Sequence, residues 1–340
     1  MKKSVRMRIS LLLAGVMLAT AACGGGGNST ASGGEMGNNE IILKLGHAMS
    51  DDHSWNVAAQ KFSDLVEERS EGTIKVELYP NSSLGGDRDL FEGMQMGNVD
   101  MALIAGVIGN FYEPIQLLEL PYIFNSQEHL EKVIYGDVGS EVLAEILEQT
   151  GVRGLEWWER TPRELTANKA VNTPQDLKGM KIRVPEITAS IDGWKAMGAN
   201  PTPMAQSEVY TALQQKTIDG QENPLANAAA VNIQEVNKYC MLTDHVYGYV
   251  LHLVSDKTWN KLTPEQQQII TDCAKEAREY QNTLIYDEEA KIRKEWEEEG
   301  VTFIEVNKED FAELAKSVHA EYAEQYGQEL YDKIVAADAE

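Results

Sequence analysis

A long uninterrupted helical pattern near the C-terminus limits most strongly what this chain can fold into. Neither proline nor glycine occurs between Pro264 and Gly300, and apolar residues recur there at helical spacing. Thr263 and Gln266 fit a capping box at its start, with Pro264 at the first helical position. At ~1.5 Å per residue such a helix exceeds ~50 Å, which is longer than one domain needs. We therefore expect it to span two domains, a number that a chain of 340 residues can form.

The rest of the chain alternates between strand patterns and helix patterns. Strands are expected at residues 41–45, 73–79, 99–105, 152–158, 180–184 and 246–254, and helices at residues 54–70, 90–96, 128–149, 189–197 and 207–214. A succession of this kind predicts an α/β fold with mostly parallel sheets. The hydrophobic fraction of 43% is sufficient for packed cores.

The N-terminus has the pattern of an export signal. Residues 1–22 begin with basic side chains and continue into an apolar run that is too short to span a membrane. The small residues before Cys23 resemble a bacterial lipobox, although Thr20 stands where that motif has a large apolar residue. The alternative is an ordinary cleaved signal with a spare cysteine. We expect Cys23 to be lipidated, because the Gly/Ser/Asn-rich residues 23–39 would form a flexible tether to a membrane.

The charge of the chain excludes some classes of partner. Its formal net charge is -24 at pH 7, and the basic residues of the export signal do not remain in the mature protein. A strongly acidic protein is not expected to bind nucleic acid or to adsorb to anionic lipid head groups. An anionic ligand remains possible, because a few arginines can set the potential inside a cleft of an acidic protein.

Cys240 and Cys273 have two interpretations. They could form a disulfide in an oxidising compartment, but nothing in the local sequence requires it. We expect two buried thiols.

Two arginines indicate a binding site for a carboxylate. Arg183 closes the strand-like residues 180–184 just before Pro185, and Arg163 precedes it in the chain. A guanidinium group matches a carboxylate with two parallel hydrogen bonds, and strand ends in α/β proteins face the crevice that binds ligands. Asn223, in a turn, can add an amide donor and acceptor. Spacing alone leaves solvated arginines or surface ion pairs as the alternative.

Three motifs in the same region resemble one transporter family. DLKGMKIRVP occupies residues 176–185, GANPTPMAQSEVYTALQ occupies residues 198–214, and DGQENP occupies residues 219–224. In this order and spacing they are similar to the TRAP-type (tripartite ATP-independent periplasmic) solute-binding proteins, and the resemblance extends from about Leu43 to the C-terminus. It implies a two-lobed periplasmic-binding-protein-like fold with crossing strands and a long helix spanning both lobes. We expect lobe I at residues 40–160 plus 249–288, and lobe II at residues 161–248 plus 289–340.

The resemblance also implies which residues meet the ligand. Arg183 would take the carboxylate, and Arg163 and Asn223 would complete the polar cage. Residues 84–88 match the family pattern L-G-x-D-R, which adds Asp87 and Arg88 as candidates; a helix cap and a surface arginine are the alternative.

Four further candidates come from strand ends and from comparison within the family. His47 ends the first strand and could touch the ligand, although a structural histidine is the alternative. Trp157 and Trp158 point to opposite faces of their strand; one belongs in the core and the other could meet the ligand, and we include Trp158. Ala105 and Gln206 stand where the sialic-acid binders have a carboxylate and an aromatic residue. A sugar acid, a C4-dicarboxylate or another monocarboxylate is therefore expected rather than sialic acid.

No pattern of catalytic residues accompanies these features. The sequence lacks a Gly-rich phosphate loop and the motifs H-E-x-x-H, C-x-x-C and G-x-S-x-G, and its six histidines do not have metal-ligand spacing. We expect no catalytic residue, cofactor or metal, and a monomeric binding protein outside the cytoplasm. The resemblance implies the small and large integral-membrane subunits of a sodium-coupled permease as partners. A sensory adaptor that presents ligand to a receptor and a sugar-acid-processing enzyme are the alternatives.

Overall fold

The computed structural model describes residues 40–339. The predicted signal, Cys23 and the predicted tether lie outside the described residues. Within this range, no helix combines the length and the apolar character that crossing a bilayer requires.

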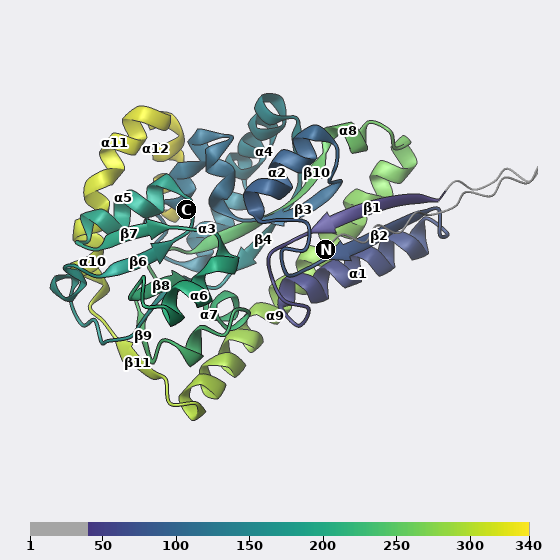
Figure 1. Cartoon of the computed structure of the whole chain (residues 1–340). Helices are drawn as coiled ribbons and strands as arrows, with labels where there is room; N and C mark the ends of the chain where they lie inside the picture. The colour runs from purple at the N-terminus through teal and green to yellow at the C-terminus, as the bar shows by residue number, and fades with distance from the viewer. Residues whose placement is uncertain (1–39, 340) are drawn as a thin grey trace, which may run out of the picture. The chain divides into compact units, whose positions relative to one another are not determined.

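Two β-sheets organise the described residues (Figure 1). The first sheet has the order β2-β1-β3-β10-β4, and the second has the order β11-β9-β5-β8-β6-β7. The bounds of the first sheet's strands are β1 (Ile41–Gly46), β2 (Ile74–Tyr79), β3 (Met101–Ile104), β4 (Val152–Arg160) and β10 (Gly248–Ser255). Those of the second are β5 (Glu164–Ala167), β6 (Lys181–Val184), β7 (Asn200–Pro203), β8 (Gly220–Asn223), β9 (Tyr239–Leu242) and β11 (Thr302–Glu305). Pairing is parallel except where β10 and β5 run antiparallel to their neighbours, which confirms the predicted α/β class.

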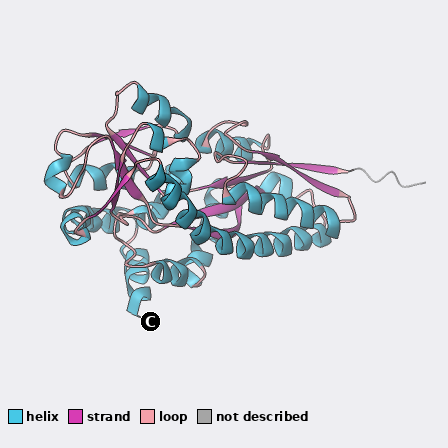
Figure 2. Cartoon of the chain, turned by 90° about the horizontal axis from the view of Figure 1, so that it is seen from below, coloured by secondary structure: helices cyan, strands magenta, loops and turns pink. Residues whose placement is uncertain are grey.

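Helices cover the faces of both sheets (Figure 2). Their bounds are α1 (Ser54–Arg69), α2 (Asp87–Met96), α3 (Gln127–Ile134), α4 (Asp137–Thr150), α5 (Thr188–Ala196), α6 (Val209–Gln214), α7 (Leu225–Ala229), α8 (Asp256–Trp259), α9 (Pro264–Glu298), α10 (Lys308–Ala315), α11 (His319–Tyr326) and α12 (Gln328–Ala336). The prediction of one helix over residues 128–149 is wrong. A break at Tyr135 and Gly136 separates α3 from α4, because the backbone of Gly136 is extended and caps the second helix instead of continuing the first.

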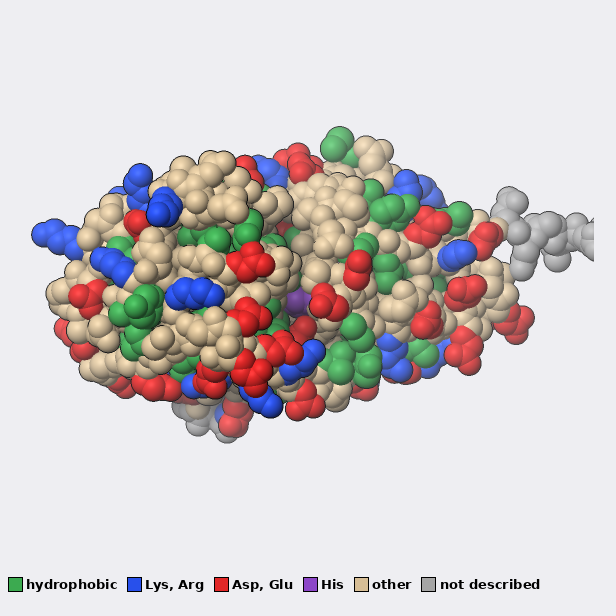
Figure 3. Space-filling model, turned by 60° about the horizontal axis from the view of Figure 1, so that its bottom comes forward, with side chains coloured by type: hydrophobic (Ala, Val, Ile, Leu, Met, Phe, Trp, Pro, Cys, Tyr) green, Lys and Arg blue, Asp and Glu red, His purple; other side chains and the backbone are tan. Residues whose placement is uncertain are grey.

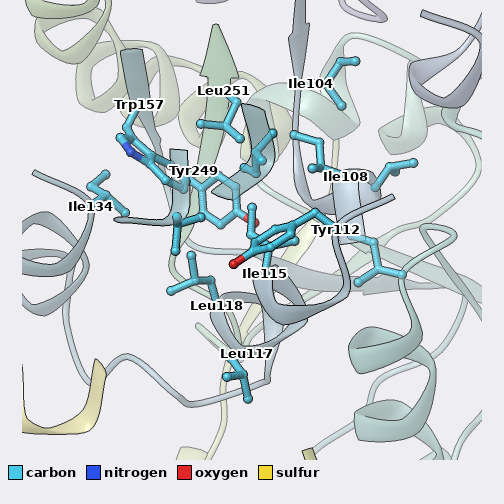
Figure 4. Close-up of a cluster of buried hydrophobic side chains, with 14 of the residues drawn as sticks. Ile104, Ile108, Tyr112, Ile115, Leu117, Leu118, Ile134, Trp157, Tyr249 and Leu251 are labelled. Carbon is cyan, nitrogen blue, oxygen red and sulfur yellow. The ribbon is translucent and has the colours of Figure 1, made fainter. Parts of the chain in front are cut away.

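The first sheet separates two hydrophobic clusters. Along β10, Leu251 and Leu253 belong to the cluster on one face, whereas Val250 and Val254 belong to the cluster that includes α1 and α9. This is the alternation expected of a strand buried on both sides. Figure 4 shows the first of these clusters, where Trp157 packs edge-on against Tyr249 at 4.8 Å between ring centroids.

The chain passes between the sheets at three places. The link from β4 to β5 and the link from β9 to β10 join the two sheets, and α9 leads from the first sheet to β11. The two links meet where the Arg163 amide donates to the Val246 carbonyl at 3.0 Å. Helix α9 is 35 residues long and packs in both cores, with Cys273 beside the first sheet and Trp296 in a cluster of the second. The predicted crossing strands and long helix are therefore confirmed.

The C-terminal helices join two different hydrophobic clusters. Helix α10 contributes Phe311 to the core of the second sheet, but Ile334 of α12 packs with Leu130 and Val133 of α3 on the side of the first sheet. The lobe boundaries stay a prediction.

The two cysteines within the described residues are free and buried, as expected. Cys240 lies in a cluster of the second sheet and Cys273 in the cluster between α1 and α9. Burial raises the pKa of both thiols, so they behave as small apolar core residues.

Candidate ligand-binding site

A cavity of about 180 Å³ lies between elements of the first sheet and elements of the second. Its walls come from α1, from the loop before α2 and the end of β3 on one side, and from β6, β8 and the segment before α6 on the other. The residues that matter below are Trp55, Asp87, Arg88, Ala105, Arg160, Arg163, Arg183, Gln206, Asn223 and Asn227. Seven of the nine residues predicted to bind ligand thus line one cavity; ligand contact itself stays a prediction.

Strand ends place the polar residues together. Strands β6 and β8 are parallel neighbours, so their C-terminal ends, with Arg183 and Asn223, meet at the same edge of the second sheet. In the register of β5 and β8, Glu164 lies opposite Asn223, which brings Arg163 to the same edge. This edge is where α/β proteins bind ligands.

Arg183 is held with one side of its guanidinium group free. Nε and Nη2 donate to the Met204 carbonyl at 3.0 and 2.7 Å, which uses the lateral pair of donors. The terminal pair, formed by Nη1 and the second hydrogen of Nη2, has no partner among residues 40–339. Burial lowers the pKa of Arg183 to about 10, with Arg163 adding to this effect and Glu222 opposing it. Arg183 is therefore charged at neutral pH and can hold a carboxylate end-on.

Arg163 is already paired with a carboxylate. Its Nε donates to Glu222 Oε2, and its Nη2 donates to Glu222 Oε1 at 2.9 Å and to the Glu222 carbonyl at 2.7 Å. His245 lies 2.9 Å from the same carboxylate through Nε2. Burial alone would raise the pKa of Glu222, but Arg163 and His245 outweigh burial and hold it at about 2. Arg163 thus faces the cavity as half of a buried ion pair, with Nη1 as the part of its guanidinium group that is left for a ligand.

An amide chain orients Asn223. Its Nδ2 donates to Gln221 Oε1 at 2.7 Å and to Gln206 Oε1 at 3.1 Å, and Gln206 Nε2 donates to the Asn227 carbonyl at 3.0 Å. These contacts use the donors of Asn223 and leave its Oδ1 as an acceptor. Gln206 therefore orients the amide of Asn223 and also lines the cavity.

The opposite wall contributes one buried acid. Asp87 begins α2, and its Oδ1 is buried without a hydrogen-bond partner within the described residues. Burial raises the pKa of Asp87 to about 6, against the opposing effect of Arg183 and Arg160. Arg88 is half-exposed, pairs with Glu92 at 3.7 Å and lies over the Phe111 ring. Ala105, at the end of β3, presents only a methyl group to the cavity.

A third buried arginine lines the cavity, and the sequence analysis missed it. Arg160 is the last residue of β4 and is 4% exposed. Burial and the neighbouring Arg163 together lower its pKa to about 10. The available signal was its position two residues after the predicted strand at 152–158 and three residues before Arg163.

His47 and Trp158 do not reach the cavity. His47 is fully buried and holds the chain after β1 through Asn56 Oδ1 at 3.1 Å and the Met49 amide at 3.2 Å, which is the structural role given as the alternative. Trp158 is fully buried between α1 and α9, edge-on to His252 at 5.6 Å. Because both faces of β4 are covered at this point, Trp157 and Trp158 both lie in cores.

The chain is similar in sequence and in structure to known solute-binding proteins. A family model described as bacterial extracellular solute-binding protein, family 7, matches residues 45–329. A solute-binding protein of Roseobacter denitrificans is 40% identical over 277 residues, covering 82% of this chain and 85% of the relative. The 2,3-diketo-L-gulonate-binding periplasmic protein of Escherichia coli is 37% identical over 266 residues, covering 77% and 80%. A TRAP periplasmic solute-binding protein from Roseobacter denitrificans, crystallised with bound L-galactonate, has a TM-score of 0.83 at 37% identity and covers 88% of this chain and 99% of that one.

The Arg163–Glu222 pair yields a prediction about stability and pH. Replacing Glu222 with glutamine leaves a buried guanidinium group without its counter-charge, so the free energy of unfolding should fall by about 3–5 kcal/mol at pH 7. The pKa of Glu222 is lower in the folded protein, at about 2, than the ordinary value of 4.5. Its contribution is therefore complete above pH ~4.5 and is lost as the pH falls towards 2.

Urea unfolding of wild type and Glu222→Gln between pH 7 and pH 3.5 measures this. Glu235→Gln, at an exposed glutamate that accepts from Tyr210, is the control and should change stability little. Equal stability of Glu222→Gln and wild type at pH 7, or a difference that grows on acidification, would contradict the prediction.

Proposed function

Because the chain belongs to the bacterial extracellular solute-binding proteins of family 7, the TRAP-type binding proteins, we propose that it holds a small organic acid by a carboxylate on Arg183. Family membership identifies a solute-binding transport protein of the extracytoplasmic compartment rather than an enzyme. The ligand would then pass to a sodium-coupled membrane permease made of a small and a large integral subunit.

One observation carries the carboxylate assignment. The terminal donors of Arg183 are unused within residues 40–339, while the Met204 carbonyl fixes its buried guanidinium group at the wall of the cavity. Two parallel, charge-assisted hydrogen bonds from a fixed donor favour a planar anion such as a carboxylate. Because the guanidinium group of Arg183 is buried, water screens the attraction less there than at the surface.

The remaining polar groups favour a hydroxylated acid. Asn223 Oδ1 can accept from a ligand hydroxyl, and Asp87 offers a second acceptor from the opposite wall. The relatives point to the same class, since one is described as binding 2,3-diketo-L-gulonate and another was crystallised with L-galactonate. With Ala105 and Gln206 in the cavity, we propose a sugar acid or a short dicarboxylate rather than sialic acid.

Residues on both sides of the cavity would enclose the ligand. His53 precedes α1 and lies 3.3 Å through Nε2 from Asn227 Oδ1 of α7, so the two sides already meet beside the cavity. We propose that the protein acts as a monomer in which the two crossing links and α9 permit the sides to move relative to one another.

A thermal-shift screen over organic acids tests the proposed function. An acid that binds only the folded protein raises its stability by about 2.7 kcal/mol at a concentration 100 times its Kd, and so raises the melting temperature. A screen of sugar acids, C4-dicarboxylates and short monocarboxylates should therefore contain at least one acid that shifts it. No shift with any acid, and none in calorimetry, would reject the function.

Arg183→Lys should weaken binding of the selected acid at least tenfold. Lysine keeps the charge but lacks two parallel donors, and truncating one partner of a buried charge pair typically costs ~2–5 kcal/mol. Titration calorimetry measures the effect. Arg69→Lys is the control, because Arg69 pairs with Glu276 at the surface and does not line the cavity. Wild-type affinity in Arg183→Lys would place the carboxylate elsewhere.

The lipid anchor is tested separately, because Cys23 lies outside the described residues. We propose that Cys23 is acylated and that the mature chain is held at the outer or periplasmic face of the membrane. Cys23→Ala should then move the protein from the membrane fraction to the soluble extracytoplasmic fraction, as judged by immunoblotting. If the variant stays in the membrane fraction as wild type does, lipidation at Cys23 is excluded as the anchor.

A further inference from the structure

We propose that Arg160 forms a second anion subsite in the cavity, so that the preferred ligand carries an acidic group at each end. This inference rests on the proposed function, because it assigns Arg183 to the first carboxylate. It adds a residue that the resemblance did not single out and narrows the substrate class from organic acids to diacids.

The guanidinium group of Arg160 is buried but has no partner for its charge. Nε and Nη2 have no hydrogen-bond partner within residues 40–339, and no ion pair of Arg160 is present there. Arg163 differs from Arg160 in this respect, because it forms an ion pair with Glu222. Buried charges are normally paired because desolvation is costly. An unpaired guanidinium group that lines a cavity is therefore suited to an anion that arrives from outside.

The strand opposite is built to leave room for this side chain. Gly248 is the cross-strand partner of Arg160 in the antiparallel pairing of β4 and β10. A Cβ at Gly248 would lie 2.0 Å from Nη2 and 2.8 Å from Nε of Arg160. Any side chain at position 248 would stand on the same face and displace the guanidinium group. The glycine therefore keeps Arg160 folded against the backbone of β10, at the wall of the cavity.

Two of the buried arginines that line the cavity, Arg160 and Arg183, have no ion-pair partner within residues 40–339. Three buried arginines line it, together with the exposed Arg88, and Glu222 forms an ion pair with Arg163. Two other acids lie near Arg160: Asp87 lines the cavity, and Glu119 is buried with Oε1 unpartnered within the described residues. Neither acid forms an ion pair or a hydrogen bond with Arg160 within the described residues, so Arg160 keeps donors for a ligand. A diacid supplies one carboxylate to Arg183 and one to Arg160.

A sugar acid with a single carboxylate offers a competing way to satisfy Arg160. Its hydroxyl oxygens can accept hydrogen bonds from the cavity-facing part of the guanidinium group without neutralising the charge. The two possibilities differ in what the terminal group of the ligand contributes. A hydroxymethyl end gives neutral acceptors, whereas a carboxylate end gives charge-assisted bonds, which are about twice as strong.

Titration calorimetry with matched pairs of acids separates them. Each pair differs only in whether one end is a second carboxylate: L-galactonate with galactarate, D-gluconate with D-glucarate, and butyrate with succinate. In the pair that binds best, the wild-type protein should bind the diacid at least tenfold more tightly than the monoacid. In Arg160→Gln this ratio of affinities should fall at least tenfold.

Two further variants complete the experiment. Gly248→Ala displaces the end of a flexible side chain rather than backbone, so it should reduce the same ratio and serves if Arg160→Gln does not fold. Arg69→Gln removes one positive charge away from the cavity lining and should keep the wild-type ratio.

The possible results distinguish this inference from the proposed function. Equal binding of diacid and monoacid, or a ratio that Arg160→Gln leaves at the wild-type value, overturns the second anion subsite while the proposed function stands. A protein that binds no organic acid overturns both. Equal weakening of monoacid and diacid by Arg160→Gln also overturns the diacid assignment, and would give Arg160 to ligand hydroxyl groups.

Discussion

The buried ion pair between Arg163 and Glu222 is the interaction on which the site depends. It lies where the β4–β5 link meets the β9–β10 link, beside the hydrogen bond from the Arg163 amide to the Val246 carbonyl. His245, on the second link, contacts the same carboxylate. One charge cluster therefore ties both crossings to the end of β8, and Asn223 follows Glu222 directly on that strand. Because breaking a buried pair is far more costly than breaking a surface pair, the end of β8 keeps its position relative to the two links.

This arrangement concentrates positive charge inside an acidic protein. The formal net charge is -24, and many acidic side chains are visible on the face seen in Figure 3. The arginines of the cavity are buried instead, and burial lowers the pKa of Arg160 and Arg183 to about 10 without making them neutral at pH 7. At an effective dielectric constant of about 20, two unit charges 4 Å apart attract by about 4 kcal/mol, compared with about 1 kcal/mol in water. For an anion inside the cavity, the attraction of a few buried arginines is therefore stronger than the repulsion from the acidic surface.

The sequence predicted the parts of this structure that local rules control. The absence of proline and glycine predicted α9, and the strand that ends before Pro185 placed Arg183 at a ligand-facing edge. Parts that depend on tertiary contacts were missed. Local sequence could not show that both faces of β4 are covered at Trp158, or that α12 packs beside α3. Arg160 was missed because its significance comes from Gly248, which is opposite it only through the register of β4 and β10.

The central claim is that the terminal donors of Arg183 hold the ligand carboxylate. A crystal structure with the acid that gives the largest thermal shift tests this most directly. The account predicts carboxylate oxygens at about 2.7–2.9 Å from Nη1 and Nη2 of Arg183, with the contact to the Met204 carbonyl retained. An acid bound with its carboxylate away from Arg183, or bound in the groove that Asp52, Glu288 and Glu295 line, would contradict it.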